Sequence, residues 1–174
     1  MSDGVVIIGY GNVLRGDDGV GWHVADILSE DPALAGAEIL ARHQLTPEMA
    51  EDVGRASLVI FIDAAAGPAA GSLAISRVEV AGQAATTWSH HLDPEALVGL
   101  AAALYGPPPA AYLVTVGAGS LEPGETLSPA VLEALPRVAA AVAGICAGHA
   151  PAGGEVAPLA SVAPAFPAAE PADA

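Results

Sequence analysis

The chain has 174 residues, 53% of them hydrophobic, and a formal charge of −15 that comes from 20 acidic residues against five arginines. This length fits a single domain with one sizeable core. Such an acidic chain lacks the positive surface needed to bind nucleic acid or anionic lipid, so we expect neither nucleic acid nor membrane as a partner. The single cysteine, Cys146, cannot form an internal disulfide, and the acidic N-terminus and short apolar runs predict a soluble, cytoplasmic protein.

Short β-branched runs alternate with segments of helical period, which predicts an α/β fold: a three-layer α/β/α sandwich with a mostly parallel, about five-stranded sheet. We expect strands at residues 5–9, 37–42, 57–63, 73–80 and 111–117, the fourth of them an edge or half-exposed strand. Helices are expected at 19–30 and 46–54, after Asp93 and after Ser128, with Pro136 kinking or dividing the last. The domain would span residues 1–150, and the Ala/Pro-rich residues 151–174 would form a disordered tail.

The stretch GYGNVLRGDDGVG, residues 9–21, follows the first predicted strand and places two adjacent aspartates at the start of a helix. A strand followed by Gly9 and Gly11 suggests a dinucleotide-binding loop, but Leu14 occupies the third glycine position of that pattern. Asp17 and Asp18 would also repel a phosphate from the helix N-terminus. The simplest role for both is helix capping, worth roughly 0.5–1 kcal/mol each, although one aspartate would suffice.

Alternatively, one aspartate caps the helix while the other faces the carboxyl ends of the strands, where open α/β sheets bind their ligands. Asp63 ends the most hydrophobic strand at that edge, and His90 and His91 precede a helix at the same edge. Taken singly, each of these residues has an ordinary structural explanation. Two carboxylates and an imidazole from three connections would together suit a divalent ion such as Ni²⁺ or Zn²⁺.

Five segments, in order and separation, carry a resemblance to a known family: GYGNVLRGDDGVG, HQLTPEMAE, VIFIDA, SHHLDPEAL and GSLEPGETLSP. The chain resembles the [NiFe]-hydrogenase maturation endopeptidases over roughly residues 4–147. The first segment meets the family pattern G-x-G-N-x-L-x-x-D-[DE]-x-x-G at every specified position.

The resemblance implies a cytoplasmic peptidase, expected as a monomer, that removes the C-terminal extension of the hydrogenase large-subunit precursor once nickel is inserted. It also implies that Asp18, Asp63 and His90 are both the metal ligands and the catalytic residues, with Ni²⁺ being that of the precursor and Zn²⁺ or Cd²⁺ able to substitute. His91 is the alternative to His90, because adjacent histidines allow an alignment to slip by one residue. His43 and Gln44 have either a substrate-facing or a structural role.

Two other functions remain open from the sequence. One is a nickel-sensing chaperone or recognition protein for the same precursor, which would bind it without cleaving it. The other is a nucleotide-binding α/β domain, which Leu14 and the paired aspartates disfavour. A thermal-shift scan with NAD, FAD or ATP tests the nucleotide hypothesis.

Overall fold

The computed structural model describes residues 4–80 and 92–148. The predicted tail at 151–174 and both predicted histidines, His90 and His91, therefore lie outside the described residues. The strands are β1 (Gly4–Tyr10), β2 (Glu38–Arg42), β3 (Ala56–Ala65), β4 (Leu73–Arg77) and β5 (Ala110–Gly117). The α-helices are α1 (Val20–Ser29), α2 (Ala50–Arg55), α3 (Pro94–Tyr105) and α4 (Pro129–Cys146), and short 3₁₀ helices occupy Gly16–Gly19, Pro32–Leu34 and Pro47–Met49.

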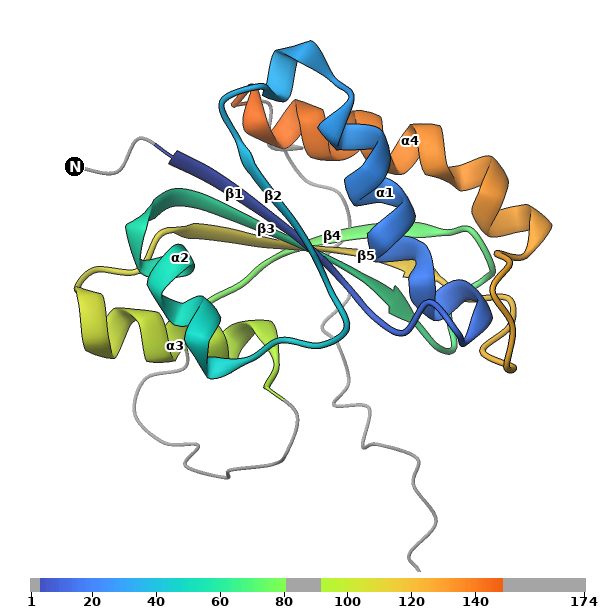
Figure 1. The fold of residues 1–174 in the computed structure, drawn as a ribbon, viewed down its shortest axis with the longest axis horizontal. Coiled ribbons are helices and arrows are strands. Elements are labelled where there is room, and N and C mark those ends of the chain that lie inside the picture. Colours follow the sequence, from blue (N-terminus) through green and yellow to red (C-terminus); the bar gives the residue numbers. More distant parts are fainter. Residues whose placement is uncertain (1–3, 81–91, 149–174) are drawn as a thin grey trace, which may run out of the picture.

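The five strands form one sheet in the order β2-β1-β3-β5-β4 (Figure 1). β2, β1, β3 and β5 are parallel, and β4 pairs antiparallel with β5 at one edge. The predicted mostly parallel, about five-stranded sheet is confirmed, and the fourth strand lies at its edge, one of the two positions expected for it. The chain leaves β1 toward β2 and returns on the other side of β1 to form β3, which makes the carboxyl ends of β1 and β3 a topological switch point.

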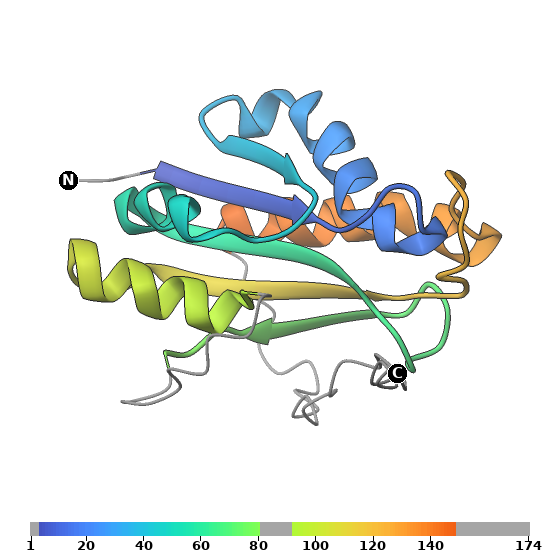
Figure 2. The ribbon, with the colours of Figure 1, turned by 60° about the horizontal axis from the view of Figure 1, so that its bottom comes forward.

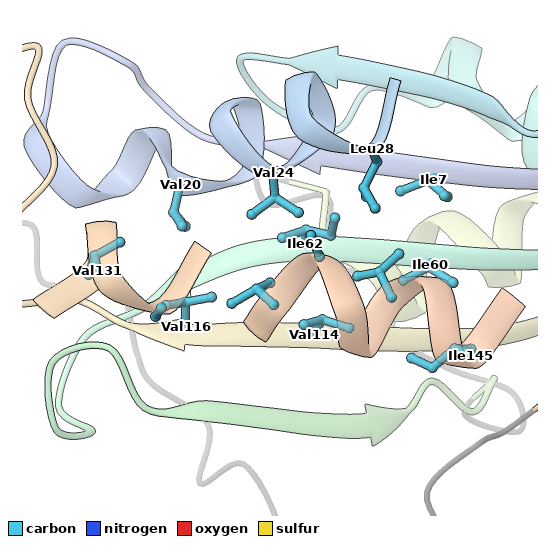
Figure 3. Packing of buried hydrophobic residues seen from close by; sticks show 14 of the residues in the cluster. Ile7, Val20, Val24, Leu28, Ile60, Ile62, Val114, Val116, Val131 and Ile145 are labelled. Carbon is cyan, nitrogen blue, oxygen red and sulfur yellow. The ribbon is translucent and has the colours of Figure 1, made fainter. Parts of the chain in front are cut away.

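Helices cover both faces of this sheet (Figure 2). On one face, side chains of α1 and α4 interdigitate with those of β1, β3 and β5, among them Val24, Leu28, Ile62, Val116 and Val131 (Figure 3). On the other face, α2 and α3 pack on the sheet around Phe61, which is fully buried. Burial on both faces explains why the β3 segment SLVIFID is almost continuously apolar rather than alternating.

Several details differ from the predicted helical patterns. The helical period of the sequence places Ile27 in one line with Val20, Val24 and Leu28, and Leu104 in one line with Leu97 and Leu100, which predicts that both are buried. In the structure they are 40% and 62% exposed. The apolar stripe of each helix is narrower than the sequence period suggests, so these positions turn toward solvent. Pro136 does not divide α4, and Gly54 lies inside α2 rather than ending it. Asp93 caps α3 as predicted, accepting a hydrogen bond of 2.7 Å from the N–H of Ala96.

Helix α4 has the length and apolar composition of a membrane-spanning helix. Its apolar residues nevertheless belong to the protein core: Val131, Val138 and Val142 are fully buried, and Ile145 is nearly so. Its composition is therefore accounted for by packing against the sheet and α1.

Candidate functional site

A cleft of about 290 Å³ lies at the switch point of the sheet. Its walls come from the end of β1, the connection that follows it, the segment after β2, and the end of β3. The lining residues are Tyr10, Gly11, Asn12, Arg15, Asp18, His43, Gln44, Leu45, Asp63 and Leu92. The structure thus brings Asp18 and Asp63, predicted from separate segments, to one cleft.

The start of α1 is held directly against the end of β1 by two glycines. A Cβ atom on Gly9 would lie 2.0 Å from the carbonyl oxygen of Gly21, and one on Gly21 would lie 2.6 Å from the N atom of Tyr10. No side chain fits in either place, so backbone packs on backbone. Trp22 fixes the same corner, because its indole Nε1 donates to the carbonyls of Gly11 and Arg42, each at 3.0 Å.

Asp18 lies in the 3₁₀ turn before α1 and faces the cleft. Its Oδ2 accepts a hydrogen bond of 2.9 Å from the N–H of Asn12, across the loop. Gly11 makes this closure feasible: its φ is +140°, and a Cβ there would lie 1.9 Å from the carbonyl oxygen of Asp18. The loop glycine and the Asn12 N–H therefore orient the Asp18 carboxylate.

Asp63 is a partly buried carboxylate near the carboxyl end of β3. Burial raises its pKa to about 7; the hydroxyl of Tyr10 and the N–H of Ala64 oppose this shift, and the charge of Asp18 adds to it. The Oδ1 of Asp63 accepts from the Ala64 N–H at 2.8 Å. Burial and the charges of Asp63, Asp93 and Asp18 in turn raise the pKa of Tyr10 well above its usual value. The site therefore concentrates negative charge in a poorly solvated place.

No ion pair neutralises Asp18 or Asp63 within residues 4–80 and 92–148. Two carboxylates that line one cleft without a cationic side chain at ion-pair distance fit a divalent cation. Asp63 would give up its proton to such a cation. The donor set is compatible with the predicted metal site.

Three metal-ligating side chains do not converge within the described residues. The third predicted ligand, His90, and its alternative, His91, lie in the segment that the structure does not describe. That segment ends next to Leu92, which lines the cleft. The assignment of a histidine ligand stays a prediction.

Asp17 has a different role from the helix cap that the sequence suggested. Its side chain is completely buried, and its two oxygens accept four hydrogen bonds from the loop after β5: Gly119 N at 2.7 Å, Ser120 N at 2.9 Å, Ser128 N at 2.6 Å and Ser128 Oγ at 2.8 Å. Burial alone would raise the pKa of Asp17, but these hydrogen bonds outweigh it and leave the pKa below its usual value. Asp17 ties two loops together that lie more than 100 residues apart in the sequence.

The backbone N–H groups of Gly11, Asn12 and residues 14–18 already donate hydrogen bonds inside the protein. Those of Gly11, Gly16, Asp17 and Asp18 donate to carbonyls of Arg42, Gly124, Ser120 and Arg15, and that of Asn12 donates to Asp18. A phosphate-binding loop requires such groups to be free and convergent. Together with the two carboxylates, this disfavours the nucleotide-binding hypothesis.

Sequence reasoning left His43 and Gln44 undecided, and both line the cleft with exposed side chains. It missed Tyr10 and Arg15 as cleft residues. Tyr10 ends β1 and Arg15 lies in the following connection, so their place beside Asp18 follows from the switch-point topology.

Comparison with known proteins agrees with this fold. No protein family model and no curated protein sequence matches the chain. Solved structures of [NiFe] hydrogenase maturation proteases share the fold over most of the chain. HycI from Thermococcus kodakarensis KOD1 superposes with a TM-score of 0.65 at 25% identity, covering 82% of this chain and 92% of that one.

Two more of these neighbours come from other organisms. The hydrogenase 2 maturation peptidase from Thaumarchaeota archaeon SCGC_AB-539-E09 has a TM-score of 0.61 at 29% identity, covering 84% of this chain and 99% of its own. The hydrogenase maturating endopeptidase HybD from E. coli has a TM-score of 0.62 at 24% identity, with 85% and 94% covered. The sequence resemblance and the structural likeness therefore point to the same group of proteins.

Proposed function

We propose that this protein is a nickel-dependent endopeptidase that removes the C-terminal extension of a [NiFe]-hydrogenase large-subunit precursor after nickel insertion. One observation carries the proposal: Asp18, from the 3₁₀ turn before α1, and Asp63, from β3, face one cleft in a fold like that of the maturation proteases and lack a neutralising partner among the described residues. The proposal includes a cytoplasmic location and action as a monomer.

The nickel belongs to the precursor, and Asp18, Asp63 and His90 would bind it. Bound there, it would supply charge stabilisation at the scissile carbonyl. The chain's own contribution is orientation: the Asn12 N–H directs the Asp18 carboxylate, and the end of β3 fixes Asp63. Only a metallated precursor would complete the set of ligands, so cleavage would depend on prior nickel insertion.

The described residues offer no serine or cysteine nucleophile in the cleft. Cys146 is at the end of α4, and burial raises the pKa of its thiol. The Ser128 hydroxyl donates to Asp17, and the Ser120 hydroxyl accepts from the N–H of Glu122. We therefore assign the attack on the peptide bond to water rather than to a side chain.

The test is a gel assay for loss of the C-terminal extension, using the large-subunit precursor from the same genome with and without nickel. We expect a shortened product only from the nickel-loaded precursor, and none with Asp18→Asn. Asp52→Asn, which removes a carboxylate at the opposite end of the sheet, is the matched control and should cleave normally.

Binding of the nickel-loaded precursor without any shortened product would overturn the peptidase proposal in favour of the recognition protein. Clear thermal stabilisation by micromolar NAD, FAD or ATP would support the nucleotide-binding alternative instead. The two outcomes use different ligands and are separable.

A further inference from the structure

Arg15 lines the cleft, and its neighbour in the sequence, Leu14, is exposed; we refer to these two residues as the lip. Leu14 is 56% exposed, and its neighbour Val13 is 37% exposed, so two consecutive apolar residues face solvent here. Arg15 follows directly, is exposed, and lines the cleft that contains Asp18 and Asp63. An exposed apolar residue thus directly precedes a cation that lines the candidate site.

The backbone that carries these two side chains is held on both sides. The N–H of Leu14 donates to Asn12 Oδ1 at 2.9 Å, and its carbonyl accepts from Gly124 N at 2.9 Å. The N–H of Arg15 donates to Asn12 O at 3.0 Å, and its carbonyl accepts from Asp18 N at 3.2 Å. A leucine presented on such a backbone can bind a partner with little loss of conformational entropy.

The loop after β5 supports the lip from behind. The N–H of Gly124 donates to the carbonyl of Leu14, and the carbonyl of Gly124 accepts from the N–H of Gly16, just after the lip, at 2.8 Å. Asp17 accepts hydrogen bonds from Gly119 and Ser128, which lie in the same loop. Gly16 adopts φ +53°, and a Cβ there would lie 2.8 Å from the carbonyl oxygen of Ser120. The backbone of the lip is therefore fixed by hydrogen bonds within the fold.

Arg15 also stands out by charge. It is one of only five cationic residues, apart from histidine, in a chain of formal charge −15. None of the carboxylates that the structure describes lies within ion-pair distance of it, although Asp18 lines the same cleft. A guanidinium placed in this way suits a carboxylate supplied by a bound peptide, which it can hold through two hydrogen bonds.

We infer that Leu14 and Arg15 are specificity-determining residues that bind the substrate peptide beside its scissile bond. Leu14 packs against an apolar side chain of that peptide, and Arg15 pairs with one of its carboxylates. Asn12 connects this recognition to the site, since its side chain holds Leu14 while its N–H holds Asp18. The inference rests on the proposed function, from which it takes the identity of the peptide.

The experiment measures binding of the nickel-loaded large-subunit precursor by biolayer interferometry, together with KM and kcat for cleavage. Leu14→Ala and Arg15→Gln should each weaken precursor binding about tenfold and raise KM, with kcat unchanged. Their affinity for Ni²⁺ alone, measured by calorimetry, should equal that of the wild type. Leu104→Ala on α3 and Arg77→Gln on β4 remove an exposed leucine and an exposed arginine elsewhere and should change neither value.

A second arm identifies the carboxylate. Precursor variants in which each Asp or Glu near the cleavage site is changed to its amide are compared with a precursor whose C-terminal carboxylate is blocked. The partner of Arg15 is the carboxylate whose removal makes wild type and Arg15→Gln bind the precursor with equal affinity. If no such change does so, the proposed pairing with a carboxylate is wrong.

The outcomes separate this inference from the proposed function. Unchanged binding and KM in both lip variants, with cleavage by the wild type, would overturn the inference alone. Weakened binding in the lip variants, with no cleavage by the wild type, would support the lip and overturn the peptidase proposal. A wild type that neither binds nor cleaves the precursor would overturn both.

Discussion

The two ends of the sheet carry hollows that differ in both size and chemistry. At the amino ends of β1 and β3, about 410 Å³ is lined by residues that include Glu38, Asp52 and Arg55. At the carboxyl ends, only about 290 Å³ is lined by residues that include Asp18 and Asp63. The larger hollow is not the better candidate for a site.

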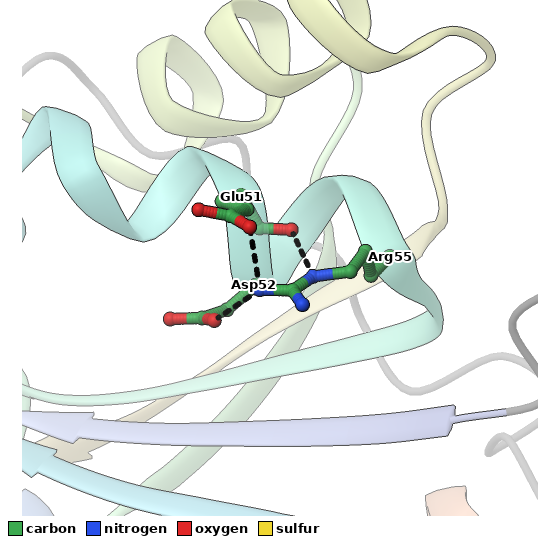
Figure 4. Close-up of polar contacts among 3 residues, drawn as sticks. All are labelled: Glu51, Asp52 and Arg55. Carbon is green, nitrogen blue, oxygen red and sulfur yellow. Dashed lines mark hydrogen bonds and ion pairs between the residues drawn. The ribbon is translucent and has the colours of Figure 1, made fainter.

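The difference lies in how the charges are compensated. At the amino end, Arg55 pairs with Glu51 at 3.0 Å and with Asp52 at 3.5 Å on one exposed helix surface (Figure 4). Each of those charges remains hydrated, so nothing further is needed to stabilise it. At the carboxyl end, the pKa of Asp63 is raised to about 7 because a buried carboxylate lacks such compensation. An uncompensated charge indicates a ligand, whereas a paired surface charge does not.

Nickel affinity should give the largest contrast between the two ends. Asp63→Asn removes a charged donor, and we expect it to weaken Ni²⁺ binding by more than about 100-fold, since changing even an outer partner of a metal ligand costs 10- to 100-fold. Asp52→Asn should leave the affinity unchanged. Isothermal titration calorimetry with Ni²⁺ measures both. Equal Ni²⁺ affinities in Asp63→Asn and Asp52→Asn would show that the carboxyl end of the sheet does not bind nickel better than the amino end.

The histidine ligand can be identified by the same titration. We expect His90→Ala to abolish most of the nickel signal and His91→Ala to have a much smaller effect. The reverse result would assign the ligand to His91, while leaving the roles of Asp18 and Asp63 unchanged.

Asp17 should give the next largest effect, on stability. In Asp17→Asn, an NH₂ group would face at least one of the four donors that now point at the carboxylate. A lost charge-assisted hydrogen bond and an unsatisfied buried donor together cost about 2–4 kcal/mol of unfolding free energy. Urea denaturation of the metal-free protein measures this loss, and Asp26→Asn, on an exposed position of α1, is the control. A loss below 1 kcal/mol would restore the simple helix-cap interpretation.

The course of the chain could be predicted because its signals are local. The Val/Ile runs of β1 and β3 and the Asp93-Pro94 start of α3 gave the order of elements, and the parallel sheet placed Asp18 and Asp63 at one edge. The resemblance to the maturation endopeptidases led to the prediction of a metal site at that edge. Neither step required knowledge of contacts distant in sequence.

The role of Asp17 could not be predicted for the opposite reason. Its partners Gly119, Ser120 and Ser128 lie 102 to 111 residues away, and no local pattern encodes their approach. Ser128 was expected to cap α4, but its hydroxyl donates to Asp17 instead. The exposure of Ile27 and Leu104 could not be predicted either, because the helical period locates the buried face of a helix but does not indicate how wide that face is.

Asp63 should also give the metal-free protein a pH-dependent stability. Its folded pKa, about 7, lies above the unfolded value of about 4, so its contribution is fully present below pH 4 and is lost as the pH rises toward 7. Allowing for solvent in the cleft, we expect wild type to lose about 2 kcal/mol relative to Asp63→Asn between pH 5 and pH 8. Urea denaturation at several pH values measures the difference. A constant difference across this range would show that Asp63 is ionised throughout.

The smallest effect is expected at the amino end of the sheet, where Arg55 carries the two ion pairs. The side chains of Arg55 and Glu51 are 63% and 58% exposed, so both charges keep most of their water and gain little from pairing. We expect Arg55→Ala to change the free energy of unfolding by less than about 0.5 kcal/mol, and added salt to reduce even this difference. Urea denaturation at low and high ionic strength tests both statements, with Arg77→Ala on the exposed end of β4 as the control. A loss comparable to that of Asp17→Asn would mean that exposed ion pairs at the amino end stabilise the protein as much as the buried Asp17 carboxylate does at the carboxyl end, and the contrast between the two ends would fail.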